Sequence, residues 1–182
     1  MTEKCWIFED NYWYLHKKET PEQVFSDLFT VALAEELNIR TIRYYIADGG
    51  VKCRNFATKC NFDSLAAVVD DINDFNGAFE GLKALGDKNL AKDYIKIRFL
   101  DAVVCNADRT INDMGILRSR KNGEIICLAP GFDYNNTLFA SCPELNIQPE
   151  NDPIVQSFCN FLHGNKEARK YLKKIKVLKL KK

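Results

Sequence analysis

The sequence has few of the residues from which metal centres and catalytic triads are commonly built. Only two histidines, His16 and His163, occur among 182 residues, which nearly excludes histidine-based metal sites and triads. The seven cysteines are scattered and form no C-x-x-C pair, so neither zinc-site spacing nor a disulfide framework is indicated. Reduced, buried thiols in a cytoplasmic protein are the better interpretation.

Long apolar runs and an excess of one charge are also lacking. No apolar run reaches the roughly 18 residues of a membrane helix, and the N-terminus has no signal-peptide pattern. Twenty-six basic and 25 acidic residues give a formal charge of +1, which argues against a general nucleic-acid binder. We therefore expect a cytoplasmic globular protein that has no membrane partner and no general nucleic-acid partner.

One local exception to this charge balance is the stretch KEARKYLKKIKVLKLKK, residues 166–182. It carries nine lysines and arginines in seventeen residues, with apolar residues at helical spacing. A packing helix with a solvated basic face is the simpler interpretation. A surface for nucleic acid or an acidic partner is the alternative, and strongly salt-dependent binding to duplex DNA would favour it.

The N-terminal third is rich in strand and turn patterns. Residues 4–18 predict an aromatic-rich hairpin with its turn at residues 9–11. Residues 20–38 predict a helix that begins at the N-cap Thr20, because apolar residues follow at helical spacing. A second strand pair is expected around the turn at residues 48–50.

Beyond about residue 60 the apolar spacing becomes helical. Segments 63–75, 91–106, 154–162 and 166–178 all show this period. The sequence thus predicts an α+β fold with a strand-rich lobe at 1–60 and a mainly helical lobe at 61–182 that contains one hairpin. A cleft between two such lobes is a natural ligand site.

The embedded hairpin is predicted from its turn. Asn122-Gly123 is a strong hairpin signal, because both central residues of a type I′ turn need positive φ. With these two residues as the loop, Leu117 lies opposite Leu128. A register slip of one residue remains compatible with the pattern.

This register gathers carboxylates at the open end of the hairpin. Asp113 lies beside Asp133, and Asp108 is one short loop upstream. Neighbouring carboxylates repel each other unless a cation intervenes, and oxygen ligands favour Mg²⁺ or Mn²⁺. Because Mg²⁺ is commonly shared between carboxylates and substrate phosphates, the pattern indicates phosphoryl transfer. Simple turn capping by these residues is the alternative.

The stretch "NADRTINDMGIL", followed by "APGFD", resembles the catalytic core of the HipA-like serine/threonine kinases. Their pattern runs approximately N-x-D-R-H-x-x-N-x-G, then a hairpin, then A-P-x-x-D. Upstream, "WYLHK" resembles the strand that carries the nucleotide-binding lysine, and "FSDLFTVALAEELNI" the helix that follows. The resemblance covers most of the chain from about residue 5 to 140 and implies a two-lobed, protein-kinase-like fold.

The resemblance also implies roles for individual residues. Asp108 takes the position of the catalytic base, and Asp133 that of the metal-binding aspartate after the hairpin. Lys17 falls where a lysine contacts the ATP phosphates, with Asp27 as its partner from the helix. A solvated surface lysine is the alternative for Lys17.

Further candidates follow from the same comparison. Arg109 would orient the catalytic loop or pair with phosphate, and Phe56 would lie near the hinge and the adenine ring. The family's metal-binding asparagine corresponds to Asp113, and Asn112 directly before it is a further candidate ligand.

The sequence departs from the family pattern at three places. Asp113 replaces the asparagine, and Thr110 replaces the histidine that follows the base by two residues. No glycine occurs before Gly49, whereas a glycine loop normally covers the phosphates in this family. Lys4 is a candidate for a substitute phosphate contact.

The resemblance implies ATP- and Mg²⁺-dependent phosphorylation of a serine or threonine hydroxyl on a protein, with autophosphorylation and toxin-like action as further expectations. A protein substrate and an antitoxin or regulatory protein are the implied partners. The departures favour an alternative, a pseudokinase that binds nucleotide or acts through protein contacts. A small-molecule phosphotransferase also remains open.

Overall fold

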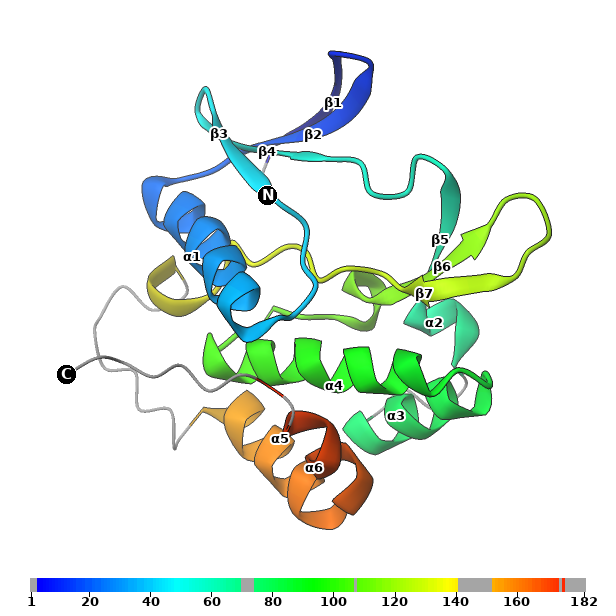
Figure 1. The fold of residues 1–182 in the computed structure, drawn as a ribbon. Coiled ribbons are helices and arrows are strands. Elements are labelled where there is room, and N and C mark those ends of the chain that lie inside the picture. Colours follow the sequence, from blue (N-terminus) through cyan, green and yellow to red (C-terminus); the bar gives the residue numbers. More distant parts are fainter. Residues whose placement is uncertain (1–2, 70–73, 107, 141–151, 174, 176–182) are drawn as a thin grey trace.

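The computed structural model describes residues 3–69, 74–106, 108–140, 152–173 and 175. The acidic residues Asp70 and Asp71 and the tail beyond residue 175 lie outside these ranges. In Figure 1 a strand-rich region lies at the top and helices α3 to α6 lie at the bottom, with α1 and the β6–β7 hairpin between them. The fold is therefore a mixture of sheets and helices, as predicted.

The strand-rich region contains an antiparallel sheet in the order β1-β2-β4-β3. Its strands are β1 Lys4–Glu9, β2 Tyr12–Lys18, β3 Tyr44–Ala47 and β4 Gly50–Arg54. The predicted first turn is confirmed: Asp10 and Asn11 have φ of 49° and 67°, the left-handed values that a type I′ turn requires. The second turn is confirmed at Asp48 and Gly49.

Helix α1, Pro21–Leu37, follows β2 and matches its predicted extent. Thr20 accepts a hydrogen bond from the Gln23 N–H, and the Gln23 side chain accepts one from the Thr20 N–H. This reciprocal pair is a capping box. Asn38 ends the helix with φ of 55°, a left-handed conformation that asparagine tolerates better than most residues.

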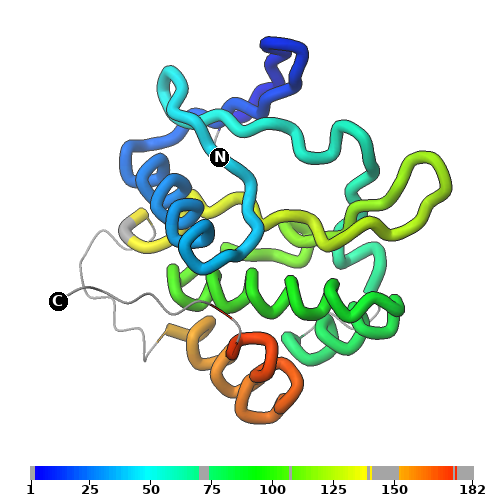
Figure 2. The backbone as a smooth tube through the Cα atoms, in the orientation of Figure 1, coloured from blue at the N-terminus to red at the C-terminus, as the bar shows by residue number. Residues whose placement is uncertain are grey.

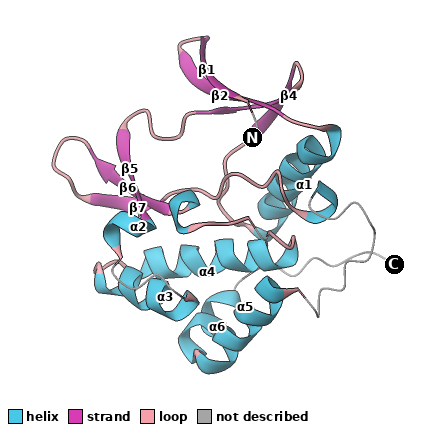
Figure 3. Cartoon of the chain, turned by 180° about the vertical axis from the view of Figure 1, so that it is seen from behind, coloured by secondary structure: helices cyan, strands magenta, loops and turns pink. Residues whose placement is uncertain are grey.

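The helical region is built around α4, Lys88–Val103. The other helices are α2 Leu65–Val68, α3 Phe75–Ala84, α5 Pro153–Gly164 and α6 Lys166–Leu172. Figures 2 and 3 show α3, α5 and α6 grouped along one side of α4, away from the strands. The predicted helix at 91–106 is confirmed as far as Val103, where α4 ends, and the one at 154–162 is confirmed in full. The helix predicted from residue 166 is confirmed as α6, which ends at Leu172.

The predicted helix at 63–75 is wrong at its beginning. Asp63 and Ser64 belong to strand β5, Cys60–Ser64, and only Leu65–Val68 form a helical turn before the undescribed residues. Strand β5 pairs with β6 along its whole length. Apolar spacing alone could not reveal this pairing, because it depends on a partner strand some fifty residues away in the chain.

The predicted hairpin exists, but its register is different. Strands β6 Gly115–Ser119 and β7 Ile125–Leu128 pair so that Leu117 lies opposite Cys127, not Leu128, with a shift between Leu117 and Arg118. The Ser119 N–H donates to the Glu124 carbonyl at 2.9 Å, which closes a four-residue loop instead of the expected two. Gly123 has a positive φ, of 73°, and Asn122 does not, so the type I′ geometry is absent.

The packing of α3 against the C-terminal helices gives a stability prediction. Phe79 is fully buried, and its ring lies 5.9 Å from that of Phe161 and 6.3 Å from that of Tyr171. Phe79→Ala should lower the free energy of unfolding by about 3–5 kcal/mol, because it leaves a cavity. Phe8→Ala, at a side chain that is 58% exposed, is the control and should change it far less. Urea unfolding of both variants measures this, and equal losses would contradict the packing of α3.

Candidate active site

The centre of the site is the ammonium group of Lys17, on β2. The side chain is almost fully buried, and its Nζ lies 2.8 Å from Asp27 Oδ2, 2.8 Å from Glu19 Oε1 and 3.0 Å from Asp133 Oδ1. These carboxylates come from helix α1, from the end of β2 and from the segment after β7. The surface-lysine interpretation is therefore wrong. The pairing of Lys17 with Asp27 is present as the kinase resemblance implied.

The charges in this cluster change the pKa values of its members. Burial alone lowers the pKa of Lys17, but the carboxylates of Asp27, Asp133 and Glu19 together outweigh it and raise that pKa above its usual value. Burial raises the pKa of Asp27 to about 6 although Lys17 pulls the other way. At Asp27, the attraction of Lys17 does not fully offset the effect of burial.

Asp133 is held by its backbone as well as by its side chain. Its φ is 60°, a strained value for a residue other than glycine, and such strain is concentrated at functional sites. The Asp133 N–H donates to the Tyr44 hydroxyl at 2.9 Å, and Lys4 Nζ lies 3.3 Å from Asp133 Oδ2. Burial works against ionisation, but Lys17 and Lys4 outweigh it and hold the pKa of Asp133 below its usual value. Both carboxylate oxygens of Asp133 are thus engaged by lysine side chains.

A cavity of about 460 Å³ opens beside this cluster. Its charged lining residues are Lys4, Lys17, Arg54, Asp113 and Asp133, and its apolar ones include Leu15, Ile42, Phe56, Phe62 and Phe132. The lining draws on β1 to β5 and on the segments at both ends of the β6–β7 hairpin. An apolar cavity with a few charged groups of both signs suits a ligand with a flat apolar part and an anionic part.

Phe56 contributes to the apolar part of this cavity. It lies in the connection between β4 and β5, and its ring is 5.5 Å from that of Phe132 and 6.0 Å from that of Phe62. The three rings form one cluster, because Phe62 and Phe132 are also 6.0 Å apart. Phe56 therefore lies in the lining of the cavity, and its proximity to an adenine ring stays a prediction.

Asp113 lines the same cavity but also has a local structural task. Its Oδ2 accepts hydrogen bonds from the Thr110 N–H at 2.9 Å and the Thr110 hydroxyl at 2.6 Å. The two residues that depart from the family pattern are therefore bonded to each other across the short helix Ile111–Asp113. The side chain of Asn112 is exposed and does not line the cavity, among the residues that the structure describes.

Asp108 lies outside the cavity lining, on the exposed loop after α4. Its Oδ2 accepts a hydrogen bond from Asn136 Nδ2 at 2.7 Å. The loop brings Asp108 to the segment that contains Asp133, three residues before Asn136. Asp108 is therefore linked to the Lys17 cluster through that segment.

Arg109 has a buried guanidinium whose contacts are all within the protein. Its Nε and Nη2 donate to Asp101 at 3.0–3.2 Å, and Nη1 donates to the Phe132 carbonyl. The group also lies 4.6 Å from the centre of the Tyr134 ring. Of the two predicted roles, these contacts match the orienting one: Arg109 ties the loop of Asp108 to the residue before Asp133.

A second cavity, of about 360 Å³, borders Arg109 and Thr110 from the helical region. It is lined by Leu65, Phe75, Tyr94 and Arg98 among others, and has no lining residue in common with the first cavity. Neither Lys17 nor Asp133 reaches it. The groups that suit a phosphate and a cation are therefore in the first cavity.

The three aspartates do not form a single set of metal ligands. Within the described part of the chain, no three histidine, cysteine, aspartate or glutamate side chains lie close enough to hold a metal ion. Asp113 and Asp133, however, line one cavity. This donor set fits Mg²⁺, which is commonly held by one or two carboxylates together with substrate phosphates.

Some residues of the site were not identified from the sequence. Glu19 is the clearest of them: it lies two residues after Lys17, and strand alternation puts positions two apart on one face. Tyr44, Asn135 and Asn136 carried no comparable signal, because their contacts join segments that are far apart in the chain.

Asp27 gives a prediction of pH dependence. Its pKa in the folded protein is about 6, above the value near 4 of an unfolded chain. The stability contributed by this raised pKa is complete below pH ~4 and is lost as the pH rises through 6. Asp27→Asn removes the titrating group, so the variant should not show this loss. Between pH 4 and 7 the unfolding free energy of the wild type should therefore fall relative to that of the variant, by at most about 3 kcal/mol.

Chemical unfolding at several pH values measures this difference. Asp48→Asn, at an exposed turn position, is the matched control and should leave the shape of the wild-type curve unchanged. A variant curve that runs parallel to the wild type from pH 4 to 7 would refute the burial argument for Asp27.

Comparison with known proteins identifies the fold. No protein-family model matches the chain, and no curated protein matches it either. Among solved structures, the crystal structure of the proinflammatory kinase CtkA of Helicobacter pylori matches with a TM-score of 0.64 at 18% identity. The match covers 92% of this chain but 62% of that kinase. The chain is thus similar to a kinase in fold, over somewhat less than two thirds of that kinase's length.

In the described part of the chain, no helix is long and apolar enough to cross a membrane.

Proposed function

We propose that this protein is a kinase that transfers the γ-phosphoryl group of ATP, with Mg²⁺, to a serine or threonine hydroxyl of a protein. The observation that carries the proposal is the buried Lys17, which is paired with Asp27 of α1 and with Asp133 after β7 beside a 460 Å³ cavity. A lysine on a strand, an acidic partner on the next helix and a metal-binding aspartate are the parts that protein kinases use to hold ATP. The kinase fold of the structural neighbour supports this reading.

The residues divide the work of phosphoryl transfer between them. The substrate hydroxyl oxygen forms a bond to the γ-phosphorus while the bond to the β–γ bridging oxygen breaks and ADP leaves. Asp108 orients the hydroxyl and accepts its proton, and Lys17 neutralises charge on the phosphates. Asp113 and Asp133 would hold Mg²⁺, which would neutralise further charge on the phosphates. Catalysis of this kind depends mainly on positioning and electrostatics.

The nucleotide fits the character of the cavity. A volume of about 460 Å³ is within the usual range of small-molecule sites, roughly 300–1,000 Å³. The Phe56, Phe62 and Phe132 rings offer an apolar contact to the adenine, and Lys4 and Lys17 offer positive charge to the phosphates. Lys4 pairs with Lys17 across β1 and β2, so both amines can face the same anion.

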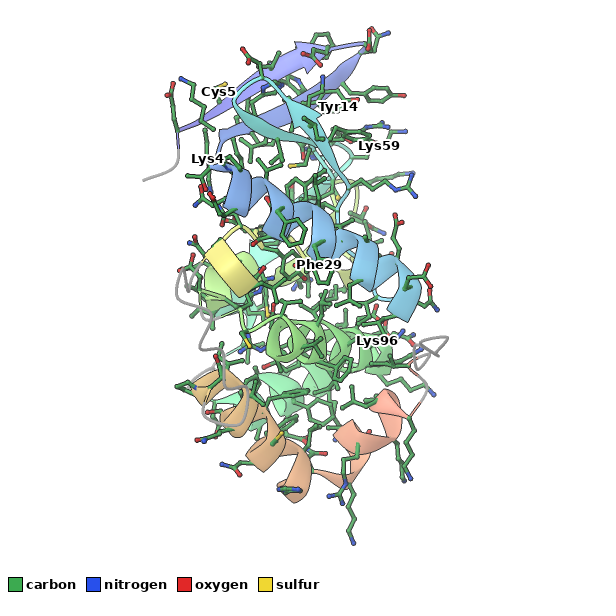
Figure 4. All side chains as sticks on the ribbon, turned by 90° about the vertical axis from the view of Figure 1, so that its left-hand side faces the viewer. Lys4, Cys5, Tyr14, Phe29, Lys59 and Lys96 are labelled. Atoms are coloured by element: carbon green, nitrogen blue, oxygen red, sulfur yellow. The ribbon has the colours of Figure 1, made fainter. Side chains whose placement is uncertain are left out.

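The finer assignment rests on the sequence motif. The resemblance of residues 106–117 and 129–133 to the HipA-like kinases supports a serine/threonine kinase of that type with two lobes, acting in the cytoplasm on a protein and subject to an antitoxin or regulatory partner. Exposed aromatic side chains support a protein partner: Trp6, Phe8 and Trp13 on the first hairpin, and Phe29 on the face of α1 turned toward the viewer in Figure 4.

A pseudokinase is the second candidate, favoured by one specific observation. The Asp113 carboxylate is engaged by Thr110 through two hydrogen bonds to a single oxygen, and the family has asparagine and histidine at these positions. An additional negative charge beside the phosphates could leave nucleotide binding intact while it slows transfer.

Substitution of the two principal aspartates tests the kinase proposal. Asp133→Ala should abolish Mg²⁺-dependent binding of an ATP analogue, because it removes the carboxylate that lines the cavity beside Lys17 and that we propose as a metal ligand. Asp108→Ala should retain that binding but lower transfer from radiolabelled ATP by about 10²-fold or more, as expected for a lost general base. Thermal unfolding with analogue, with and without Mg²⁺, measures binding through the midpoint shift. Unchanged transfer in Asp108→Ala would remove Asp108 from the role of base.

The Asp113→Asn variant distinguishes a kinase from a pseudokinase. Its amide oxygen can accept both Thr110 hydrogen bonds, so the melting midpoint should stay within about a degree or two of the wild type. On the kinase proposal the lost carboxylate weakens Mg²⁺ binding, and a higher Mg²⁺ concentration should be needed for half-maximal transfer. A marked rise in transfer at saturating Mg²⁺ would instead identify Asp113 as a partial impairment of a working site, whereas the absence of transfer from both wild type and variant would support the pseudokinase candidate.

A further inference from the structure

The residues Asn135 and Asn136 follow Asp133 closely, and their side chains contact different parts of the site. Asn135 Nδ2 donates to Glu19 Oε1 at 2.9 Å, and the same oxygen forms an ion pair with Lys17 Nζ at 2.8 Å. Asn136 Nδ2 donates to Asp108 Oδ2 at 2.7 Å. One asparagine therefore contacts the candidate nucleotide half of the site, and its neighbour contacts the candidate acceptor half.

We propose that Asn135 and Asn136 are paired positioning residues, Asn135 acting through Glu19 on the phosphate-binding Lys17 and Asn136 acting on the base Asp108. This inference rests on the proposed kinase function and assigns two residues that the sequence motif leaves without a role. Because adjacent residues share a short backbone segment, the two halves of the site are held at a fixed spacing.

The side chain of Asn136 contacts an exposed carboxylate, that of Asp108. Asp108 is exposed, and an exposed aspartate side chain samples several rotamers unless something holds it. Within the described residues, the Asp108 carboxylate accepts its hydrogen bond from the Asn136 side chain. It occupies Oδ2 and leaves Oδ1 available for a substrate hydroxyl. A charge-assisted bond of 2.7 Å is of the strong type.

Asn136 is in turn held by helix α1. Gln23 Nε2 lies 3.4 Å from Asn136 Oδ1, which orients the carboxamide so that its NH₂ group faces Asp108. Gln23 is also the capping-box residue of α1, and Asp27 on the same helix holds Lys17. Helix α1 thus reaches both the base and the phosphate-binding lysine.

Asn135 and Lys17 contact the same carboxylate oxygen, Oε1 of Glu19. Glu19 is fully buried at its side chain, and its Oε2 has no hydrogen-bond partner within the part of the chain that is described. The carboxylate is therefore poorly compensated, since a buried charge requires several partners. Asn135 donates one hydrogen bond to the Glu19 carboxylate and so weakens the attraction between Glu19 and Lys17. On the proposed function, Lys17 must also be available to the phosphates.

The test compares two neighbouring alanine variants of the full chain. Asn136→Ala should lower kcat for a generic acceptor protein such as casein by about tenfold, the size expected for one hydrogen bond to a charged group, with affinity for a Mg²⁺–ATP analogue unchanged. Asn135→Ala should weaken analogue affinity by roughly three- to tenfold, because Glu19 then competes more strongly for Lys17, with kcat at saturating ATP unchanged. Analogue binding is measured on the protein alone, independently of turnover.

Matched variants separate positioning from a loss of structure. Asn61→Ala, at an exposed position of β5, should alter neither quantity. Asn136→Gln, which keeps a carboxamide donor, should recover part of the lost kcat. If Asn136→Ala fails to fold, Gln23→Glu serves in its place: it preserves the capping box but removes the donor to Asn136, and kcat alone should fall.

The outcomes keep this inference apart from the proposed function. A wild-type chain that binds the analogue but phosphorylates no acceptor would overturn the kinase proposal and the inference with it. A wild-type chain that does transfer phosphate, combined with variants that lose kcat and affinity in parallel, would leave the kinase proposal standing and overturn the inference. A kcat effect for one residue and an affinity effect for its neighbour would support it.

Discussion

The buried ammonium of Lys17 is the interaction on which the rest of the site depends. An unpaired charge in the interior costs several kcal/mol, so a buried lysine must have acidic partners in its final position. Those partners arrive from three separate segments: Glu19 from the end of β2, Asp27 from α1 and Asp133 from beyond β7. The sheet, the first helix and the segment after the hairpin are therefore fixed relative to one another by a single charge.

A second buried ion cluster performs the same task from the helical side. Asp101 on α4 accepts hydrogen bonds from Arg98, Asn106 and Arg109, and Arg109 also donates to the Phe132 carbonyl. Phe132 directly precedes Asp133. The residues from 132 to 136 therefore lie between two clusters, and small movements there would alter the contacts of both Lys17 and Asp108. This explains why a strained φ of 60° at Asp133 is tolerated, since the surrounding contacts determine that conformation.

Local signals in the sequence were sufficient for much of the fold. Thr20 and Pro21 at the start of α1, Asn38 at its end and the turn at Asp10 and Asn11 all act within a few residues, and all were predicted correctly. Asn122-Gly123 misled because the same pair suits a four-residue loop as well as a two-residue one. The choice between the two loops is made by strand pairing, including that of β5 with β6, which no local pattern records.

The candidate site divides in the same way. Lys17, Asp27, Asp108 and Asp133 came from the resemblance to the HipA-like kinases, whereas Glu19 was missed although strand alternation indicated its face. The bond between Thr110 and Asp113 was missed as well, although T-x-x-D is the spacing of a capping box. Their contact indicates that the two departures compensate each other locally: threonine supplies two donors that an aspartate, with its charge, can accept more strongly than an asparagine.

The balance of charge in the cluster has a consequence for ligand binding. Lys17 and Lys4 face Glu19, Asp27 and Asp133, an excess of one carboxylate in a largely buried setting. Repulsion among carboxylates favours uptake of a proton or a cation. An ATP phosphate alone would add to the negative charge, whereas ATP with Mg²⁺ brings cation and anion together. On the proposed function, Asp133 would exchange its contacts with the two lysines for the metal, and the lysines would become the partners of the phosphates. Glu19 and Asp27 would meanwhile keep their ion pairs with Lys17.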